Sequence, residues 1–397
     1  MKSDFIFTSE SVTEGHPDKL CDQISDALVD SFLQQDPFAL IAAECAVATG
    51  ILFIAARFAA DATVDIAGVA RQTIAGAGYD SSHGFDPNLC SVMTSLNEIP
   101  DSGHAKRNEA DLDDAEIEKI VPANQATVFG FACTQTPGLM PLPIWLAHKL
   151  ARGLAAARTS GELVYLAPDG KSQVAVEYRD RRAARIHSIT VISATKNGLV
   201  PSANTLRNDI MDLVVASAFA DEPIRPDANT LVFVNPGGPF RDGGPALHAG
   251  LTGRKSGVDT YGEYARQSDS ALSGKDPSRI DRVGAYAARY AARNVIEAGL
   301  AEECEIQLSY TIGRARPVSM QVETFATGRI PDTEIAERLD RAFDFRLANI
   351  IRHFDLRRLP ARSKEGFYRR LAAYGHVGRI DLPVPWEKDS LREHLAG

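Results

Sequence analysis

Helical and extended patterns mix throughout this chain, in three blocks of similar size, and this order constrains the fold more than any other feature. Each block contains helices with one apolar face together with strand-like runs, and no block is built from one kind of element alone. Such mixing favours an α+β architecture of three sheet-and-helix units over a single doubly wound sheet.

The expected elements follow from residue spacing, because apolar residues at every third or fourth position indicate helices and strict alternation indicates strands. We expect helices at residues 18–34, 64–78, 141–158, 206–219, 282–300 and 335–351. We expect strands at residues 43–58, 127–136, 174–180, 185–196, 230–236, 304–313 and 318–327.

The length of 397 residues is too great for one ordinary core, so several domains are expected. Residues 97–124 are highly charged and poor in apolar side chains, which is typical of a boundary or a mobile loop. A glycine-rich stretch opens the last region. We predict an N-terminal α+β domain at 1–101, a mobile active-site loop at 102–124, a central α+β domain at 125–233 and a C-terminal α+β domain at 234–397.

The composition excludes several classes of protein. A formal net charge of -9 argues against a nucleic-acid partner, which requires a basic face. No apolar run is long enough to cross a bilayer, and the first residues lack the layout of a signal peptide. The five cysteines are scattered without a CxxC pair, so neither a zinc site nor a disulfide framework is indicated. We therefore expect a cytoplasmic protein with no membrane partner.

The segment at residues 8–26 places His16 and Asp18 on either side of Pro17, where a loop turns into a helix. Proline suits the first helical position, and the N-terminus of a helix favours phosphate. There, His16 can donate to a leaving phosphate oxygen and Asp18 can hold a metal that bridges such oxygens. A capped surface helix is the alternative, so further phosphate-binding residues must decide.

A set of cations in glycine- or aspartate-rich motifs supplies such residues. The motifs PDGKSQV, GLTGRK and SGKDPSRIDR contain Lys171, Arg254, Lys255, Lys275 and Arg279, with Asp281 in the last of them. Each cation alone would be an ordinary surface charge, but together with two candidate metal carboxylates they suggest a polyphosphate clamp. No nucleophilic serine or cysteine has a recognisable base. This fits a displacement whose leaving group is a polyphosphate and whose nucleophile has no proton to lose.

These motifs, with LMPLPIWLAHKL, VDTYG, GAYAARY, CEIQLSY and AAYGHVGR, resemble the S-adenosylmethionine synthetase (methionine adenosyltransferase) family from residue 5 to residue 386. The resemblance implies three similar α+β domains about a pseudo-threefold axis. It also implies a homodimer with active sites between the subunits, in some cases paired into a tetramer. The implied reaction is attack of the methionine sulfur on C5′ of ATP, followed by hydrolysis of the released tripolyphosphate to phosphate and diphosphate.

The matched motifs also imply roles for single residues. His16 would assist the departure of the triphosphate, which would be bound by Lys171, Arg254, Lys255 and Lys275. Two Mg2+ ions would be held by Asp18 and Asp281, and a K+ ion by Glu44. The nucleotide would contact Phe240, which packs on adenine in the family, Asp169, and Arg279, which replaces a lysine.

The chain departs from the family pattern where methionine and ribose would lie. Arg57 stands where the family has a glutamate associated with the methionine ammonium group. Glu98 and Ile99 replace the glutamine and serine of the active-site loop, which continues as Pro-Asp at 100–101. Asn124 and His248 replace aspartates. Loss of acidic partners at about three positions would weaken binding of an ammonium group by several kcal/mol, at roughly 1.5–3 kcal/mol for each charged hydrogen bond.

Three readings of these departures remain open at the level of sequence. The protein is a divergent methionine adenosyltransferase with compensating residues, an enzyme that adenosylates a related thioether, or a weakly active or regulatory paralogue. Retention of the phosphate-side residues argues against a complete loss of activity. A nucleotide-binding module without catalysis is disfavoured, since it would not need metal carboxylates beside a cation cluster.

Overall fold

The computed structural model describes residues 3–99, 108–241 and 243–396. Glu98 and Ile99, which depart from the family pattern, therefore lie within the described residues. Positions 100–101 and the first part of the predicted loop, 102–107, lie outside them. Among the described residues, no helix is both long enough and apolar enough to span a bilayer.

In the described part of the chain, three sheets form the framework, and each draws strands from distant parts of the sequence. In hydrogen-bonded order, the first sheet is β1 (Phe5–Val12), β6 (Leu166–Arg179), β7 (Arg182–Thr195) and β8 (Leu231–Val234), with β9 (Phe240–Arg241) also pairing β7. The second sheet is β10 (Gly250–Leu251), β2 (Leu40–Ala48), β3 (Ile51–Ala59) and β4 (Ser91–Glu98). The third sheet is β12 (Ser319–Glu323), β11 (Glu303–Tyr310) and β5 (Ala126–Cys133).

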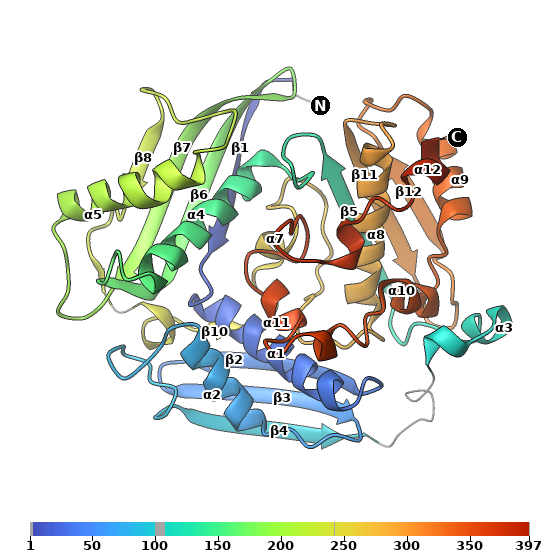
Figure 1. Ribbon diagram of the computed structural model, residues 1–397, viewed down its shortest axis with the longest axis horizontal. Helices are drawn as coiled ribbons and strands as arrows, with labels where there is room; N and C mark the ends of the chain where they lie inside the picture. Colours follow the sequence, from blue (N-terminus) through green and yellow to red (C-terminus); the bar gives the residue numbers. More distant parts are fainter. Residues whose placement is uncertain (1–2, 100–107, 242, 397) are drawn as a thin grey trace.

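One long helix covers the inner face of each sheet. α1 (Pro17–Gln35) packs on β2, α4 (Leu142–Thr159) on β6 and β1, and α8 (Ile280–Glu297) on β5 and β11. The sheets lie at three sides of the molecule with these helices toward its centre (Figure 1). The apolar faces of helices and strands, buried against each other, form the core. The α+β class with three sheet-and-helix units is confirmed.

The other elements are shorter and connect or cover this framework. The α-helices are α2 (Ile66–Gly76), α3 (Asp114–Ile117), α5 (Ala203–Asp209), α6 (Ala216–Ala218), α7 (Ser256–Asp259), α9 (Asp332–Ala342), α10 (Leu347–Phe354), α11 (Tyr368–Leu371) and α12 (Arg392–Ala396). A π-helical segment, Ile210–Val215, joins α5 to α6. Short 3-10 turns occur at Glu109–Asp111, Gly244–Ala246, Pro360–Arg362 and Pro385–Glu387.

The single helix predicted at 335–351 is wrong, because the chain leaves the helical conformation between α9 and α10. Phe343 is extended, with φ -141° and ψ 134°. Arg346 then precedes α10 in an extended conformation, and its buried guanidinium pairs with Asp114, Glu118 and Asp344. These ion pairs fix the break and attach residues 114–118 to the C-terminal part of the chain, which local spacing alone does not reveal.

The outward face of the second sheet is open and partly apolar. Leu251, Ala46, Phe53 and Met93 pair across its four strands in a single row. Phe53 is 41% exposed and Met93 is 54% exposed. An apolar row of this kind on a sheet is typical of a surface that another protein covers.

Candidate active site

The N-terminus of α1 is built around His16, which is the N-cap residue, with Pro17 as the first helical residue. The Nδ1 atom of His16 accepts a hydrogen bond from the backbone N–H of Asp18 at 3.2 Å, which satisfies one of the free donors of the first turn. The buried hydroxyl of Tyr79 donates to the carbonyl oxygen of Gly15 at 2.5 Å. The turn that presents His16 is therefore held from both sides.

His16 is a neutral hydrogen-bond donor at physiological pH. Burial lowers the pKa of His16 to about 4, although the negative charges of Asp169 and Asp18 act in the opposite direction. Because Nδ1 of the neutral ring already accepts a hydrogen bond, the proton resides on Nε2. A neutral imidazole with a fixed N–H is suited to stabilise an oxygen on which negative charge develops.

Cations gather around Asp18 at the same helix terminus. The Oδ1 atom of Asp18 accepts from the backbone N–H of Leu251 at 3.1 Å and lies 3.7 Å from Nη1 of Arg254. The Nζ atom of Lys255 lies 3.8 Å from Oδ2 of Asp18. Lys171, on β6 opposite Val12, is close enough for its charge to act on His16. We call His16, Asp18, Asp169, Lys171, His248, Arg254 and Lys255 the first half-site.

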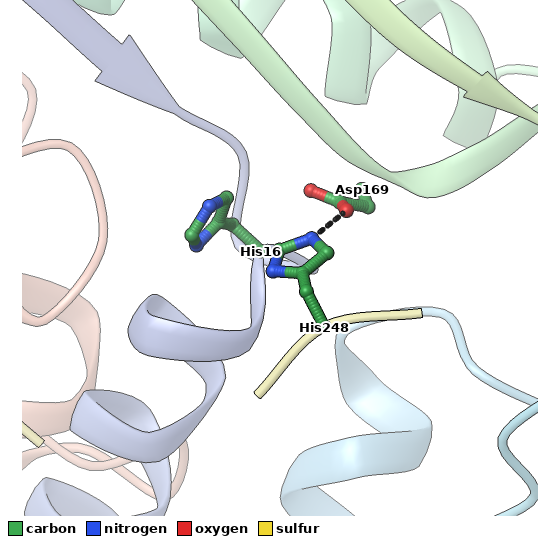
Figure 2. A group of neighbouring side chains, drawn as sticks. All are labelled: His16, Asp169 and His248. Carbon is green, nitrogen blue, oxygen red and sulfur yellow. Dashed lines mark hydrogen bonds and ion pairs between the residues drawn. The ribbon is translucent and has the colours of Figure 1, made fainter. Parts of the chain in front are cut away.

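Asp169 and His248 complete the first half-site (Figure 2). Nε2 of His248 lies 2.9 Å from Oδ2 of Asp169, which also accepts the backbone N–H of Gly244 at 2.8 Å. The ring of His248 lies beside that of His16, with 5.1 Å between the ring centroids. Asp169 is 1% exposed, and its Oδ1 atom is buried without a hydrogen-bond partner in the described structure.

One possible ligand atom from each of His16, Asp169 and His248 lies within 4.8 Å of the other two. Two imidazoles and one carboxylate match the ligand preference of transition metals, whereas Mg2+ prefers oxygen atoms. Because the two rings already make hydrogen bonds with Asp18 and Asp169, Mg2+ binding is better served by the carboxylates of Asp18 and Asp281.

A second group of predicted residues lies at the other end of β2. Nζ of Lys275 pairs with Oδ2 of Asp281 at 2.7 Å, and the side-chain amide of Asn124 lies 3.5 Å from Oδ1 of Asp281. Arg279 occupies the N-cap position of α8 in the same loop, and its Nε atom lies 4.0 Å from Oδ2 of Asp276. We call Asn124, Lys275, Arg279 and Asp281 the second half-site.

The two half-sites are separate within one chain. Ala42 of β2 forms a bridge with Lys275, whereas Val47 of the same strand pairs with Gly250, just before the GLTGRK cations. Five residue steps of extended strand correspond to roughly 17 Å. The structure thus brings together the predicted residues of each half-site but does not bring the half-sites themselves together.

The remaining predicted residues lie outside these two groups. Glu44 and Arg57 are exposed on the open face of the second sheet, the face that carries the row through Phe53. Glu98 ends β4, and the backbone N–H of Ile99 donates to Phe58. Phe240 on β9 begins the loop whose Gly244 binds Asp169.

Three contributors to the first half-site are not predicted from the sequence. Tyr79 and the backbone N–H of Gly244 act through tertiary contacts, so local spacing gives no signal for them. The third contributor is Glu10, whose carboxylate lies 3.8 Å from Nζ of Lys255. Its position in the TSES segment, directly before the histidine motif, could have indicated a role in the site.

A buried histidine, a carboxylate and clustered cations at a helix terminus are the features expected of an enzyme site for a phosphate-rich substrate. The sequence matches the S-adenosylmethionine synthetase N-terminal domain over residues 4–100, its central domain over 119–240 and its C-terminal domain over 242–388. The chain belongs to the S-adenosylmethionine synthetase family.

Relatives named S-adenosylmethionine synthase match nearly the whole chain. The protein from Microcystis aeruginosa is 48% identical over 98% of this chain and 96% of its own length. The protein from Gloeothece citriformis is 47% identical over 97% of this chain and 94% of its own. The protein from Trichormus variabilis is 46% identical over 100% of this chain and 97% of its own.

Proposed function

We propose that the protein transfers the adenosyl group of ATP to the sulfur of methionine, giving S-adenosylmethionine with phosphate and diphosphate from the tripolyphosphate. The neutral His16 at the start of α1, beside the cations of the first half-site, is the observation that carries this proposal. Similarity over nearly the whole chain to proteins named S-adenosylmethionine synthase supports it and does not favour a different thioether or a weakly active paralogue.

The residues of the half-sites have complementary roles in this reaction. Nε2–H of His16 donates to the oxygen that leaves C5′ and stabilises its developing charge. Lys171, Arg254, Lys255 and Lys275 bind the triphosphate and position it in line with the attacking sulfur. A thioether has no proton to lose, so its attack requires no base. The charge that must be stabilised in the transition state therefore develops on the triphosphate leaving group, which the cations bind.

Asp18 and Asp281 suit Mg2+, because carboxylate oxygens combined with phosphate oxygens are its usual ligands. Bound there, Mg2+ would neutralise the negative charge of the phosphate groups. Glu44 is our proposed K+ ligand, and its carboxylate lies on the open sheet face that carries the row through Phe53.

A homodimer accounts for both the separated half-sites and the open sheet face. If a second copy covers the row through Phe53 and Met93, a two-fold axis can oppose the first half-site of one subunit to the second half-site of the other. Each complete site then contains both Mg2+ carboxylates, and the exposed apolar row is buried. A further pairing of dimers into a tetramer is compatible with this arrangement.

We also propose a cytoplasmic location, since all five cysteines are buried free thiols, as is usual in reducing compartments. The domain boundaries predicted at 101, 125 and 233 remain our proposal, although strands cross between the units: β1 joins β6, and β10 joins β2.

The test is mass spectrometry of the purified protein incubated with ATP, Mg2+, K+ and methionine, with phosphate release followed in parallel. We expect S-adenosylmethionine in step with phosphate and diphosphate. In His16→Gln the rate should fall by roughly 100- to 1,000-fold, as for loss of one oxyanion donor. The exposed His394 provides a matched control, and His394→Gln should retain the rate. Phosphate release without S-adenosylmethionine would contradict the proposal.

A further inference from the structure

Asp169 and His248 form a hydrogen-bonded carboxylate–imidazole pair that adenosyl transfer to a thioether does not require. Asp169 comes from β6 and His248 from the loop before β10, and they meet through Oδ2 and Nε2 at 2.9 Å (Figure 2). The Gly244 N–H binds the same oxygen and fixes the carboxylate from a second direction. Pairs of this kind orient an imidazole for proton transfer.

The hydrogen-bonding pattern defines which nitrogen of His248 carries the proton. Burial raises the pKa of Asp169, but the hydrogen bonds from His248 and Gly244 act against burial, and the pKa ends below its ordinary value. Asp169 is therefore an ionised carboxylate, which can only accept hydrogen bonds. Nε2 of His248 must be the N–H donor, which leaves Nδ1 as the ring nitrogen that can accept a proton.

His248 is the more exposed imidazole of this cluster. Its side chain is 32% exposed, whereas the side chains of His16 and Asp169 are almost completely buried. The titratable groups that face His248 are Asp169 from β6 and His16 from the α1 terminus, and Lys171 acts on the same His16 ring. The leaving-group donor and a free basic nitrogen thus lie side by side.

We propose that the Asp169–His248 pair gives this protein a further activity, adenosyl transfer from ATP to a small aliphatic thiol, with His248 as the general base. The proposal rests on the adenosyl transfer proposed above. The S–H proton passes to Nδ1 of His248, the sulfur electron pair forms a bond to C5′, and the C5′–O bond breaks with its electron pair going to the triphosphate. The products are a neutral thioether and triphosphate, and the imidazolium returns its proton to water.

Homocysteine and methionine are a matched pair of substrates for the test, because they differ only in the S-methyl group. Wild-type protein with ATP and Mg2+ is given each in turn, and the adenosyl products are quantified by mass spectrometry between pH 6.5 and pH 9.5. His248→Gln keeps an N–H donor toward Asp169 but has no basic nitrogen. His248→Asn serves if that variant fails to fold, and His394→Gln is the control.

At pH 7 we expect the ratio of homocysteine to methionine kcat/KM to fall by about 100-fold or more in His248→Gln, as for loss of a general base. This deficit should shrink above the thiol pKa of about 8.5, where the thiolate forms without a base. Wild-type S-adenosylmethionine formation without a homocysteine product would overturn the inference alone, as would an unchanged ratio at every pH. Absence of both products would overturn the proposed function as well.

Discussion

Two inactive variants, one in each half-site, should restore activity when they share a dimer. His16→Gln removes the leaving-group donor of the first half-site, and Lys275→Ala removes a phosphate cation of the second. If each active site combines half-sites from two subunits, a mixed dimer contains one doubly altered site and one fully wild-type site. The separation of roughly 17 Å along β2 within a single chain is the structural basis for this expectation.

The magnitude follows from counting sites. Random association of equal amounts of two variants makes half of the dimers mixed, and each mixed dimer has one intact site of two, so about one quarter of wild-type activity should return. The variants are mixed in denaturant and refolded together or produced together in one cell. S-adenosylmethionine formation is then compared with that of each variant alone.

A second mixture provides the matched control. His16→Gln and Lys171→Ala both alter the first half-site, so every site of their mixed dimer contains one altered residue and no recovery is expected. Activity of the His16/Lys275 mixture no greater than the mean of its two components would refute the reasoning, since it would mean that each site is completed within one chain.

Three further measurements test other features. Because burial lowers the pKa of His16 to about 4 from the ordinary 6.5, its contribution to the free energy of unfolding is complete above pH 6.5 and is lost as pH falls toward 4; an NMR inflection of His16 near pH 6.5 would contradict this. Glu109→Ala should lower the free energy of unfolding by about 3–5 kcal/mol in urea, because the buried guanidinium of Arg357 loses its ion-pair partner. A change below 1 kcal/mol would show that the ion pair is not maintained. Phe53→Glu should shift the dimer toward monomer in analytical ultracentrifugation and lower activity with it, whereas an unchanged mass would place the subunit contact elsewhere.

Local patterns predicted most helices and strands because those elements bury one regular face. The helix expected at 18–34 is α1, that at 141–158 is α4 and that at 282–300 is α8, which ends before Gly299 with φ 70°. The break between α9 and α10 was not predicted, since it depends on ion pairs of Arg346 with residues more than two hundred positions away. The pairing of β1 with β6 was not predicted either, because these strands are distant in sequence.

The candidate site shows the same division between local and tertiary information. The helix-terminal geometry of His16 and Asp18 follows from Pro17 and the spacing after it, and the structure places both at the start of α1. The partners of Asp169 do not follow from spacing, because His248 and Gly244 come from a loop 75 or more positions further along the chain. The order of the motifs in the sequence likewise does not predict that these residues are divided between two half-sites.

The departures from the family pattern take on a different meaning once their positions are known. His248 lies in the first half-site and Asn124 in the second, and Arg57 lies on the open sheet face opposite Ala42, so within one chain His248 is apart from the other two. They can act on one substrate only if a second subunit brings them together. The mixed-dimer experiment therefore also bears on substrate choice: recovery of activity across subunits would make Arg57 and Asn124 candidates for specificity at a shared site. Without recovery, His248 alone would remain positioned beside His16, and selection between thioether and thiol would rest on that imidazole.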